Sequence, residues 1–220
     1  MREGRPITGV AVGPSSHPST GHKVVIVVAL SSMADPARRK ATYDDLLRVP
    51  DDLIAEILGG ELVTSPRPGA AHGVAASATG GSLVPPFQFG EGGPGGWWIL
   101  PEPELHVGED ILVPDFAGWR RERMPAPPSG PYISQAPNWI CEILSPSTAR
   151  IDRVRKLPIY ASWQVNHAWL IDPEARTLEV FRLETGHWLL LGAYADASRV
   201  RAEPFDAVEI DLFRLWGAEE

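Results

Sequence analysis

The chain has 220 residues, of which 44% are hydrophobic and eight are tryptophan, so it can bury one substantial core but hardly two. The formal net charge is -8 at pH 7, and no basic stripe for gripping phosphates is evident. A single cysteine, Cys141, excludes an intrachain disulfide and a cysteine-rich zinc site. It favours a reducing compartment, so we expect a cytoplasmic protein.

The first 32 residues differ in composition from the rest. Gly, Pro, Ser and Thr dominate residues 4–21, and the only apolar run, residues 24–30, is too short to span a bilayer. One basic residue before so short a run is a poor match to a signal peptide. We predict a disordered leader over residues 1–40, a single domain over residues 41–220, and no membrane partner.

Two short elements open the predicted domain. Thr42 can cap a helix that runs through Arg48, because its hydroxyl can accept a hydrogen bond from a free N–H group of the first turn. Residues 53–58 and 61–65 are short runs separated by Gly59-Gly60, a dipeptide typical of two-residue hairpin turns. We therefore predict a helix followed by an antiparallel hairpin.

The middle of the chain alternates between helix, loop and strand signals. Residues 70–84 predict a weak helix, and the proline- and glycine-rich residues 85–96 predict an exposed loop. Residues 97–107 and 111–119 are expected to pair as strands. Asp115 lies in the second of these, directly after a proline that marks a strand edge or an irregularity.

A buried strand with one acidic side chain is predicted at residues 139–144. Side chains alternate between faces along a strand, so Glu142 points the same way as Ile140 and Leu144, whereas Cys141 points to the opposite face. A carboxylate in this setting must be protonated, paired or bound to a cation, because burying a lone charge is costly. Glu142 is therefore a candidate for chemistry.

The residues after this strand bring a basic group back toward it. Residues 145–148 predict a turn with helix-capping side chains, and a helical pattern begins near Ala149. Asp152, Lys156 and Tyr160 recur every four residues and so share one helix face. Farther on, antiparallel strands are predicted at residues 168–171, 177–183 and 188–193. A short strand and a helical turn are predicted at residues 205–216.

Two acidic residues and a lysine occur along the chain in an order that suits phosphodiester hydrolysis. Paired carboxylates such as Asp115 and Glu142 suit Mg²⁺, which takes few protein ligands and keeps waters and phosphate oxygens in its other positions. Lys156 could stabilise charge developing on a phosphate or help to deprotonate the attacking water. The chain lacks the hydrolase nucleophile elbow, the phosphate-binding loop and the helical zinc-protease motif.

These residues resemble those of a known nuclease group. The order Pro-Asp, then an acid on a strand, then a lysine is similar to the PD-(D/E)XK nuclease superfamily. More closely, the string from Glu142 to Thr148 together with Asp152, Lys156 and Tyr160 resembles the Uma2 (DUF820-like) family of restriction-endonuclease-like proteins. The other matching positions are Glu56, Gly60-Glu61-Leu62-Val63, His72 and Pro114-Asp115.

The resemblance implies an α/β (α+β) fold, with a restriction-endonuclease-like mixed central β-sheet flanked by helices. It also implies a Mg²⁺- or Mn²⁺-dependent endonuclease acting on nucleic acid, with DNA as the expected substrate and a homodimer left open. Asp115 and Glu142 would be the metal ligands and Lys156 the catalytic lysine. The auxiliary candidates are Glu56, His72, Asp152 and Tyr160.

The chain departs from the family pattern in three places. The superfamily lysine two residues after the acid would fall at Leu144, so the resemblance places the cation on the helix, at Lys156. Pro158 can kink that helix just after the lysine. Gln164 stands where the family usually has glycine.

Each candidate also has a plainer interpretation. Lys156 could form an ordinary exposed ion pair with Asp152, Asp115 could be a turn residue, and Glu142 could pair with a core arginine. His72 could assist the chemistry or cap its helix. Two function classes stay open: a metal-dependent endonuclease, and an inert nuclease fold that binds or regulates, which the acidic balance and the missing strand lysine favour.

Overall fold

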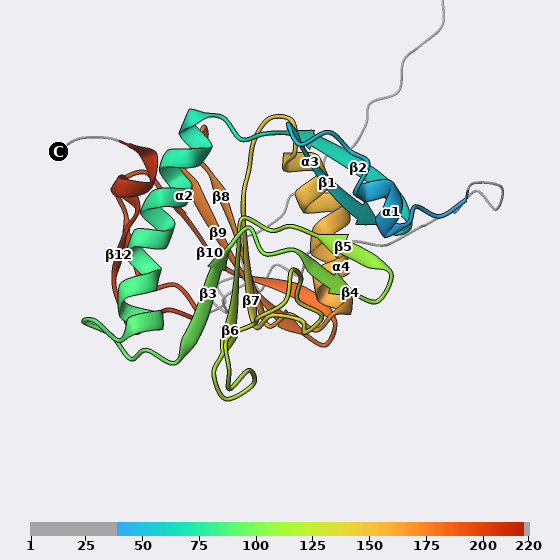
Figure 1. The fold of residues 1–220 in the computed structure, drawn as a ribbon. Coiled ribbons are helices and arrows are strands. Elements are labelled where there is room, and N and C mark those ends of the chain that lie inside the picture. Colours follow the sequence, from blue (N-terminus) through green and yellow to red (C-terminus); the bar gives the residue numbers. More distant parts are fainter. Residues whose placement is uncertain (1–38, 218–220) are drawn as a thin grey trace, which may run out of the picture.

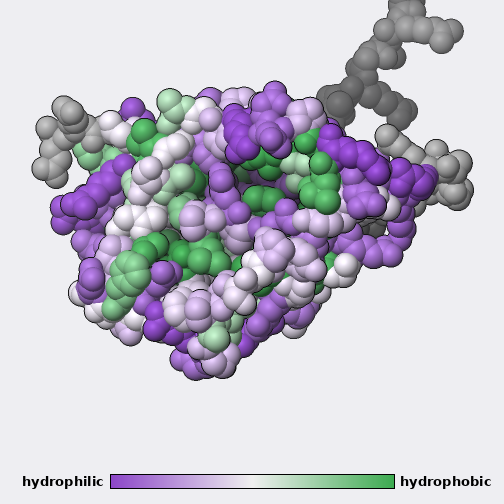
Figure 2. Space-filling model, in the orientation of Figure 1, coloured by the Kyte–Doolittle hydropathy of each residue, from purple (hydrophilic) through white to green (hydrophobic). Residues whose placement is uncertain are grey.

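The computed structural model describes residues 39–217, drawn in colour in Figure 1. The predicted leader lies outside the described residues except for Arg39 and Lys40, which form ion pairs with Asp45 and Glu109. None of the helices in the described part is long and apolar enough to cross a membrane. The face seen in Figure 2 mixes hydrophilic residues with separate apolar patches.

The first elements form as the sequence predicts, with small shifts at their ends. Thr42 caps α1 (Tyr43–Leu46), since its hydroxyl accepts a hydrogen bond from the Asp45 N–H group at 3.3 Å. β1 (Leu53–Leu58) and β2 (Glu61–Pro66) form the expected hairpin. Gly59 and Gly60 at its turn have φ of 60° and 81°, left-handed values that glycine adopts without strain.

A six-stranded mixed sheet forms the centre of the fold, in the order β10-β9-β8-β7-β6-β3 (Figure 1). β7 and β8 run parallel, and the other neighbours run antiparallel. The strands are β3 (Trp97–Pro101), β6 (Phe116–Arg120), β7 (Trp139–Ile143), β8 (His167–Asp172), β9 (Thr177–Glu184) and β10 (His187–Ala195). The mixed α+β class and the antiparallel strands after the central helix are confirmed.

A smaller antiparallel sheet has the order β2-β1-β5-β4, where β4 is Leu105–Val107 and β5 is Asp110–Leu112. The chain closes with the pair β11 (Arg199–Val200) and β12 (Ile210–Asp211), followed by the 3-10 turn η3 (Leu212–Trp216). The predicted final strand and helical turn are therefore confirmed.

One predicted strand pair is wrong. Residues 97–107 and 111–119 do not pair along their length, because the chain divides each of them between the two sheets. β3 pairs with β6 in the six-stranded sheet, whereas β4 pairs with β5 in the smaller one. The predicted strand 111–119 is broken at Pro114, which has no N–H group to donate to a neighbouring strand. Asp115 is thereby left between the sheets, immediately before β6.

The proline-rich segment after α2 is partly helical rather than an exposed loop throughout. η1 (Val84–Phe89) is a π-helical turn that continues α2, and Phe87 within it is only 1% exposed. The Gly90 N–H group donates to the carbonyl of Pro85, five residues back, so the turn closes although two of its residues are prolines. The loop itself is confined to the residues around Gly90–Gly96.

Helices cover both faces of the six-stranded sheet (Figure 1). They are α2 (Ala70–Leu83) on one face and, on the other, the continuous run α3 (Ala149–Ile151), η2 (Asp152–Lys156) and α4 (Leu157–Ser162). Cys141 packs in the core cluster that includes Ala75 of α2, whereas Ile140 packs in the cluster that includes Tyr160 of α4. The alternation predicted along β7 is therefore confirmed.

The helix that carries Lys156 contains one widened turn. The Leu157 N–H group donates to the carbonyl of Asp152, five residues back, so η2 is π-helical. Pro158 follows at the start of α4, where a residue without an N–H group is tolerated. We attribute the widened turn to this proline, whose ring would crowd the carbonyl four residues back in a regular helix.

Candidate active site

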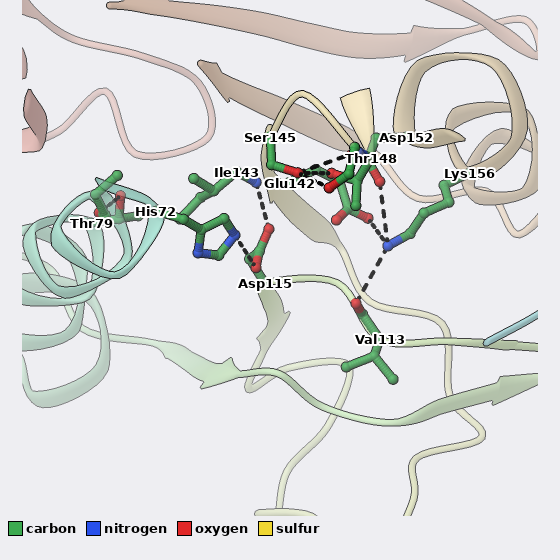
Figure 3. Close-up of polar contacts among 12 residues, drawn as sticks. His72, Thr79, Val113, Asp115, Glu142, Ile143, Ser145, Thr148, Asp152 and Lys156 are labelled. Carbon is green, nitrogen blue, oxygen red and sulfur yellow. Dashed lines mark hydrogen bonds and ion pairs between the residues drawn. The ribbon is translucent and has the colours of Figure 1, made fainter. Parts of the chain in front are cut away.

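A cleft of about 100 Å³ beside the end of β7 brings most of the predicted site residues together (Figure 3). They come from the smaller sheet, from α2, from the chain between the sheets, from β7 and from the helix after it. The predicted residues that line it are Glu56, His72, Asp115, Glu142, Asp152 and Lys156.

Asp115 is held between α2 and β7 (Figure 3). The register of β6 on β7 continues to place it opposite Glu142. Its Oδ1 lies 2.9 Å from His72 Nε2, and its Oδ2 accepts a hydrogen bond from the Ile143 N–H group at 2.6 Å. Burial alone would lower the pKa of His72, but the hydrogen bond and charge of Asp115 raise it. His72 therefore faces Asp115. It is not the cap of its helix, because the N-cap residue of α2 is Gly69.

Lys156 Nζ lies among three carboxyl groups and one carbonyl. It is 2.9 Å from Glu56 Oε1, 2.9 Å from Glu142 Oε1, 3.8 Å from Asp152 Oδ1, and 3.4 Å from the Val113 carbonyl oxygen. The side chain is 4% exposed, so the alternative of an exposed helix ion pair is wrong. Burial alone would lower the pKa of Lys156, but the carboxylates raise it well above its usual value. The ammonium group stays charged.

Glu142 is held from behind by a tyrosine. The Tyr160 hydroxyl donates to Glu142 Oε1 at 2.6 Å, the same oxygen that meets Lys156. Burial raises the pKa of the Tyr160 hydroxyl well above its usual value, so this group keeps its proton and remains a donor. Burial also raises the pKa of Glu142. The cation that pairs with Glu142 is therefore a lysine, and not the core arginine that the plainer interpretation allowed.

Acidic groups outnumber basic groups in this cleft. Four carboxyl groups face one lysine, one arginine and one histidine, so the fully ionised cluster has one negative charge in excess. Burial raises the pKa of Asp152 to about 6, with further increases from Glu56 and Asp115 against the lowering effect of Lys156. The cluster therefore retains protons that a bound cation could replace.

The donor chemistry of Asp115 and Glu142 fits a hard divalent cation. Both offer carboxylate oxygens. Burial raises the pKa of Glu142, Lys156 lowers it, and the negative charges of Asp152 and Asp115 raise it further. Across residues 39–217, no group of three or more His, Cys, Asp or Glu side chains is arranged as a metal site. Two carboxylates would suffice for Mg²⁺, which keeps waters and phosphate oxygens in its other positions.

The sequence does not predict two backbone contacts in the cleft. The Val113 N–H group donates to Glu56 Oε1 at 2.8 Å, while the Val113 carbonyl accepts from Lys156. Such backbone contacts leave no side-chain signature. Arg67 also lines the cleft, between Pro66 and Pro68.

The serine- and threonine-rich turn after β7 is built differently from the prediction. Thr148 occupies the N-cap position of α3, but its side chain makes no capping hydrogen bond. Instead, Ser145 Oγ bonds to Ser147 Oγ at 2.9 Å and to Thr148 Oγ1 at 3.0 Å (Figure 3). Thr148 also hydrogen-bonds to the side chain of Asp152. The turn therefore serves the cleft wall as well as the start of the helix.

The chain is similar to known proteins in fold and in sequence. A crystal structure described as that of "a putative nuclease belonging to DUF820", from Anabaena variabilis ATCC 29413, is similar in fold, with a TM-score of 0.64 and 20% sequence identity. The similarity covers 80% of this chain and 98% of that one. None of the curated proteins matches the chain. The model of the Uma2 family, described as "Putative restriction endonuclease", matches residues 41–212, and the chain belongs to this family.

Proposed function

We propose that this protein is a divalent-metal-dependent endonuclease that hydrolyses phosphodiester bonds of DNA. The observation that carries the proposal is the position of Lys156, whose Nζ lies 2.9 Å from Glu142 in a cleft that Asp115 also lines. Membership of the Uma2 family supports nuclease chemistry, as does the description of the Anabaena relative in fold. The excess of carboxylates supports the need for a bound cation.

In this proposal Asp115 and Glu142 hold Mg²⁺ or Mn²⁺ through their carboxylate oxygens. When bound, the ion would supply a water of lowered pKa and neutralise charge on the phosphate. Lys156 remains an ammonium group and stabilises the negative charge that develops on the phosphate in the transition state. Tyr160 orients Glu142 by donating to its Oε1, and His72 orients Asp115.

The first test concerns the metal. Glu142→Gln should abolish Mn²⁺ binding and keep the fold, because the amide loses the charge but retains an oxygen that can accept from Tyr160. Isothermal titration calorimetry measures the binding, and Glu122→Gln, which changes an exposed carboxylate, is the matched control. Equal Mn²⁺ affinity in wild type and Glu142→Gln would exclude Glu142 as a ligand.

The second test concerns the lysine. Lys156→Ala should leave Mn²⁺ binding nearly intact, but it should slow cleavage by roughly 10²–10³, the usual effect of removing one transition-state donor. Single-turnover cleavage of labelled single-stranded, duplex and branched DNA, and of RNA, measures this under matched metal and with chelator. Lys40→Ala, at an exposed lysine, is the control, and circular dichroism verifies that each variant is folded. Equal rates would exclude Lys156 from the mechanism.

One observation favours a second candidate, an inert nuclease fold that binds nucleic acid or has a regulatory role. Leu144 stands where the superfamily has its lysine, and it is 3% exposed in an apolar core cluster. Binding of DNA without cleavage of any substrate by the wild type, with either metal, would support this candidate and contradict the first.

A further inference from the structure

A second hollow, of about 200 Å³, lies at the opposite end of β7 from the cleft. Asn138, which lines it, directly precedes β7, whereas Glu142 lies near the end of the strand. Four residues of extended chain separate the two by about 13 Å. The residues of the hollow that matter here are Trp97, Arg120, Asn138, Asn166, His167 and Arg182.

The two asparagines of the hollow have engaged oxygens and a free donor. Asn138 Oδ1 accepts a hydrogen bond from the backbone N–H group of Arg120 at 3.0 Å. Asn138 Nδ2 donates to Asn166 Oδ1 at 3.0 Å. Within residues 39–217, Asn166 Nδ2 has no hydrogen-bond partner. The pair therefore offers N–H groups to a ligand rather than lone pairs.

Arg120 supplies a fixed positive charge. Its guanidinium carbon lies 4.5 Å from the centre of the Trp97 ring, a cation–π contact that fixes the group in position. No carboxylate in the described part of the chain forms an ion pair with it. Its N–H edges remain available, and a planar guanidinium binds phosphate oxygens in pairs.

The opposite wall carries an arginine that is already paired with carboxylates. Arg182 forms ion pairs with Glu184 at 2.7 Å and with Glu203 at 3.0 Å, and Glu203 also lies 3.2 Å from His167 Nε2. Burial lowers the pKa of His167, the hydrogen bond and charge of Glu203 oppose this, and the charges of Arg182 and Arg120 add smaller decreases. This wall therefore adds no unpaired positive charge, and among the described residues that line the hollow Arg120 is the arginine without a carboxylate partner.

We propose that this hollow binds a phosphate group, held by the Arg120 guanidinium and the Asn166 amide. A phosphate offers several acceptor oxygens to donors that converge from different segments, and its charge is complementary to the unpaired Arg120 guanidinium. The same chemistry is presented by free phosphate and by the terminal phosphate of a nucleic-acid strand. The proposal is independent of metal binding and of cleavage in the cleft.

Calorimetry in chelator, with no divalent metal, tests this proposal. The probes are inorganic phosphate and two oligonucleotides of one sequence, with and without a 5′-phosphate. Wild type should bind inorganic phosphate, and Arg120→Gln should weaken this binding about tenfold or more, because a charge-assisted pair is lost. Arg176→Gln, at an exposed turn between β8 and β9, is the matched control and should bind as wild type does.

A second variant tests the charge of the hollow while Arg120 is kept. Asn166→Asp retains the oxygen that accepts from Asn138 but replaces the free donor with a negative charge, so phosphate binding should again weaken. Tighter binding of the 5′-phosphorylated oligonucleotide would identify a strand end as the source, and equal binding of the two would identify free phosphate. Absence of phosphate binding by wild type, or equal affinity in wild type and both variants, would overturn the proposal.

Discussion

At the residue scale, Asp152 shows how burial sets the acid–base properties of the cleft. The carboxyl group is buried, lies 3.8 Å from Lys156, and shares a hydrogen bond with Thr148. Its pKa is raised to about 6, above the ordinary 3.8, because desolvation disfavours the charged form more than Lys156 favours it. The folded protein therefore binds a proton here more tightly than the unfolded chain does.

This shift predicts a pH-dependent effect of Asp152→Asn. The stabilising contribution of the proton is complete below about pH 4 and is lost as the pH rises through about 6. Asparagine does not ionise. When the pH is raised from 4.5 to 7.5, the unfolding free energy of the variant should therefore increase by about 1–3 kcal/mol relative to that of wild type. Urea denaturation at the two pH values measures it, with the exposed Asp52→Asn as control. A pH-independent difference would contradict the assigned shift.

At the element scale, the end of α4 explains why the family pattern prefers glycine at one position. Gln164 has φ of 60°, the left-handed conformation that commonly ends helices and that glycine adopts most easily. The Val165 N–H group donates to the Tyr160 carbonyl at 3.1 Å, so this turn also fixes the start of the path to β8. The chain keeps the backbone geometry and tolerates the strain.

Gln164→Gly should therefore stabilise the protein, by up to about 1 kcal/mol, because relief of left-handed strain outweighs the extra freedom of glycine in the unfolded chain. Gln164→Ala is the matched control. It loses the side-chain hydrogen bond to the Ala161 carbonyl without relieving the strain, so it should not stabilise. Thermal unfolding compares the three proteins, and a glycine variant no more stable than the alanine variant would contradict this account.

At the scale of the whole molecule, the cleft joins the two sheets. Lys156 contacts Glu56 of β1, in the smaller sheet, and Glu142 of β7, in the larger one, each at 2.9 Å. Arg155 adds a second link, since its guanidinium donates to the Leu58 carbonyl at 2.8 Å. The candidate site is thus also part of the interface that holds the fold together.

Lys156→Met should consequently destabilise the protein by about 3–5 kcal/mol at pH 8, since it leaves buried carboxylates without their cation. The loss should shrink at pH 5.5, because Asp152, whose pKa is about 6 even with Lys156 lowering it, is then mostly protonated and leaves one unpaired charge fewer. Urea denaturation measures both values, with Lys40→Met as the exposed control. A loss below about 1 kcal/mol at pH 8, the size expected of a surface pair, would contradict the bridging role.

The sequence by itself determined the elements whose signals are local. The Gly59-Gly60 hairpin, the cap at Thr42 and the alternation that separates Glu142 from Cys141 follow from turn chemistry and from the two-residue period of a strand. The order of Asp115, Glu142 and Lys156 also indicated residues that the fold brings into one cleft.

Only the tertiary structure decided which strands share a sheet and which groups become buried. The break at Pro114 was visible, but the division of its neighbours between two sheets depends on pairing with distant strands. The burial of Lys156, its contact with the Val113 carbonyl and the hollow around Arg120 all join segments far apart in the chain. Local propensity carries no information on such contacts, because the free energy that selects them arises from packing between elements.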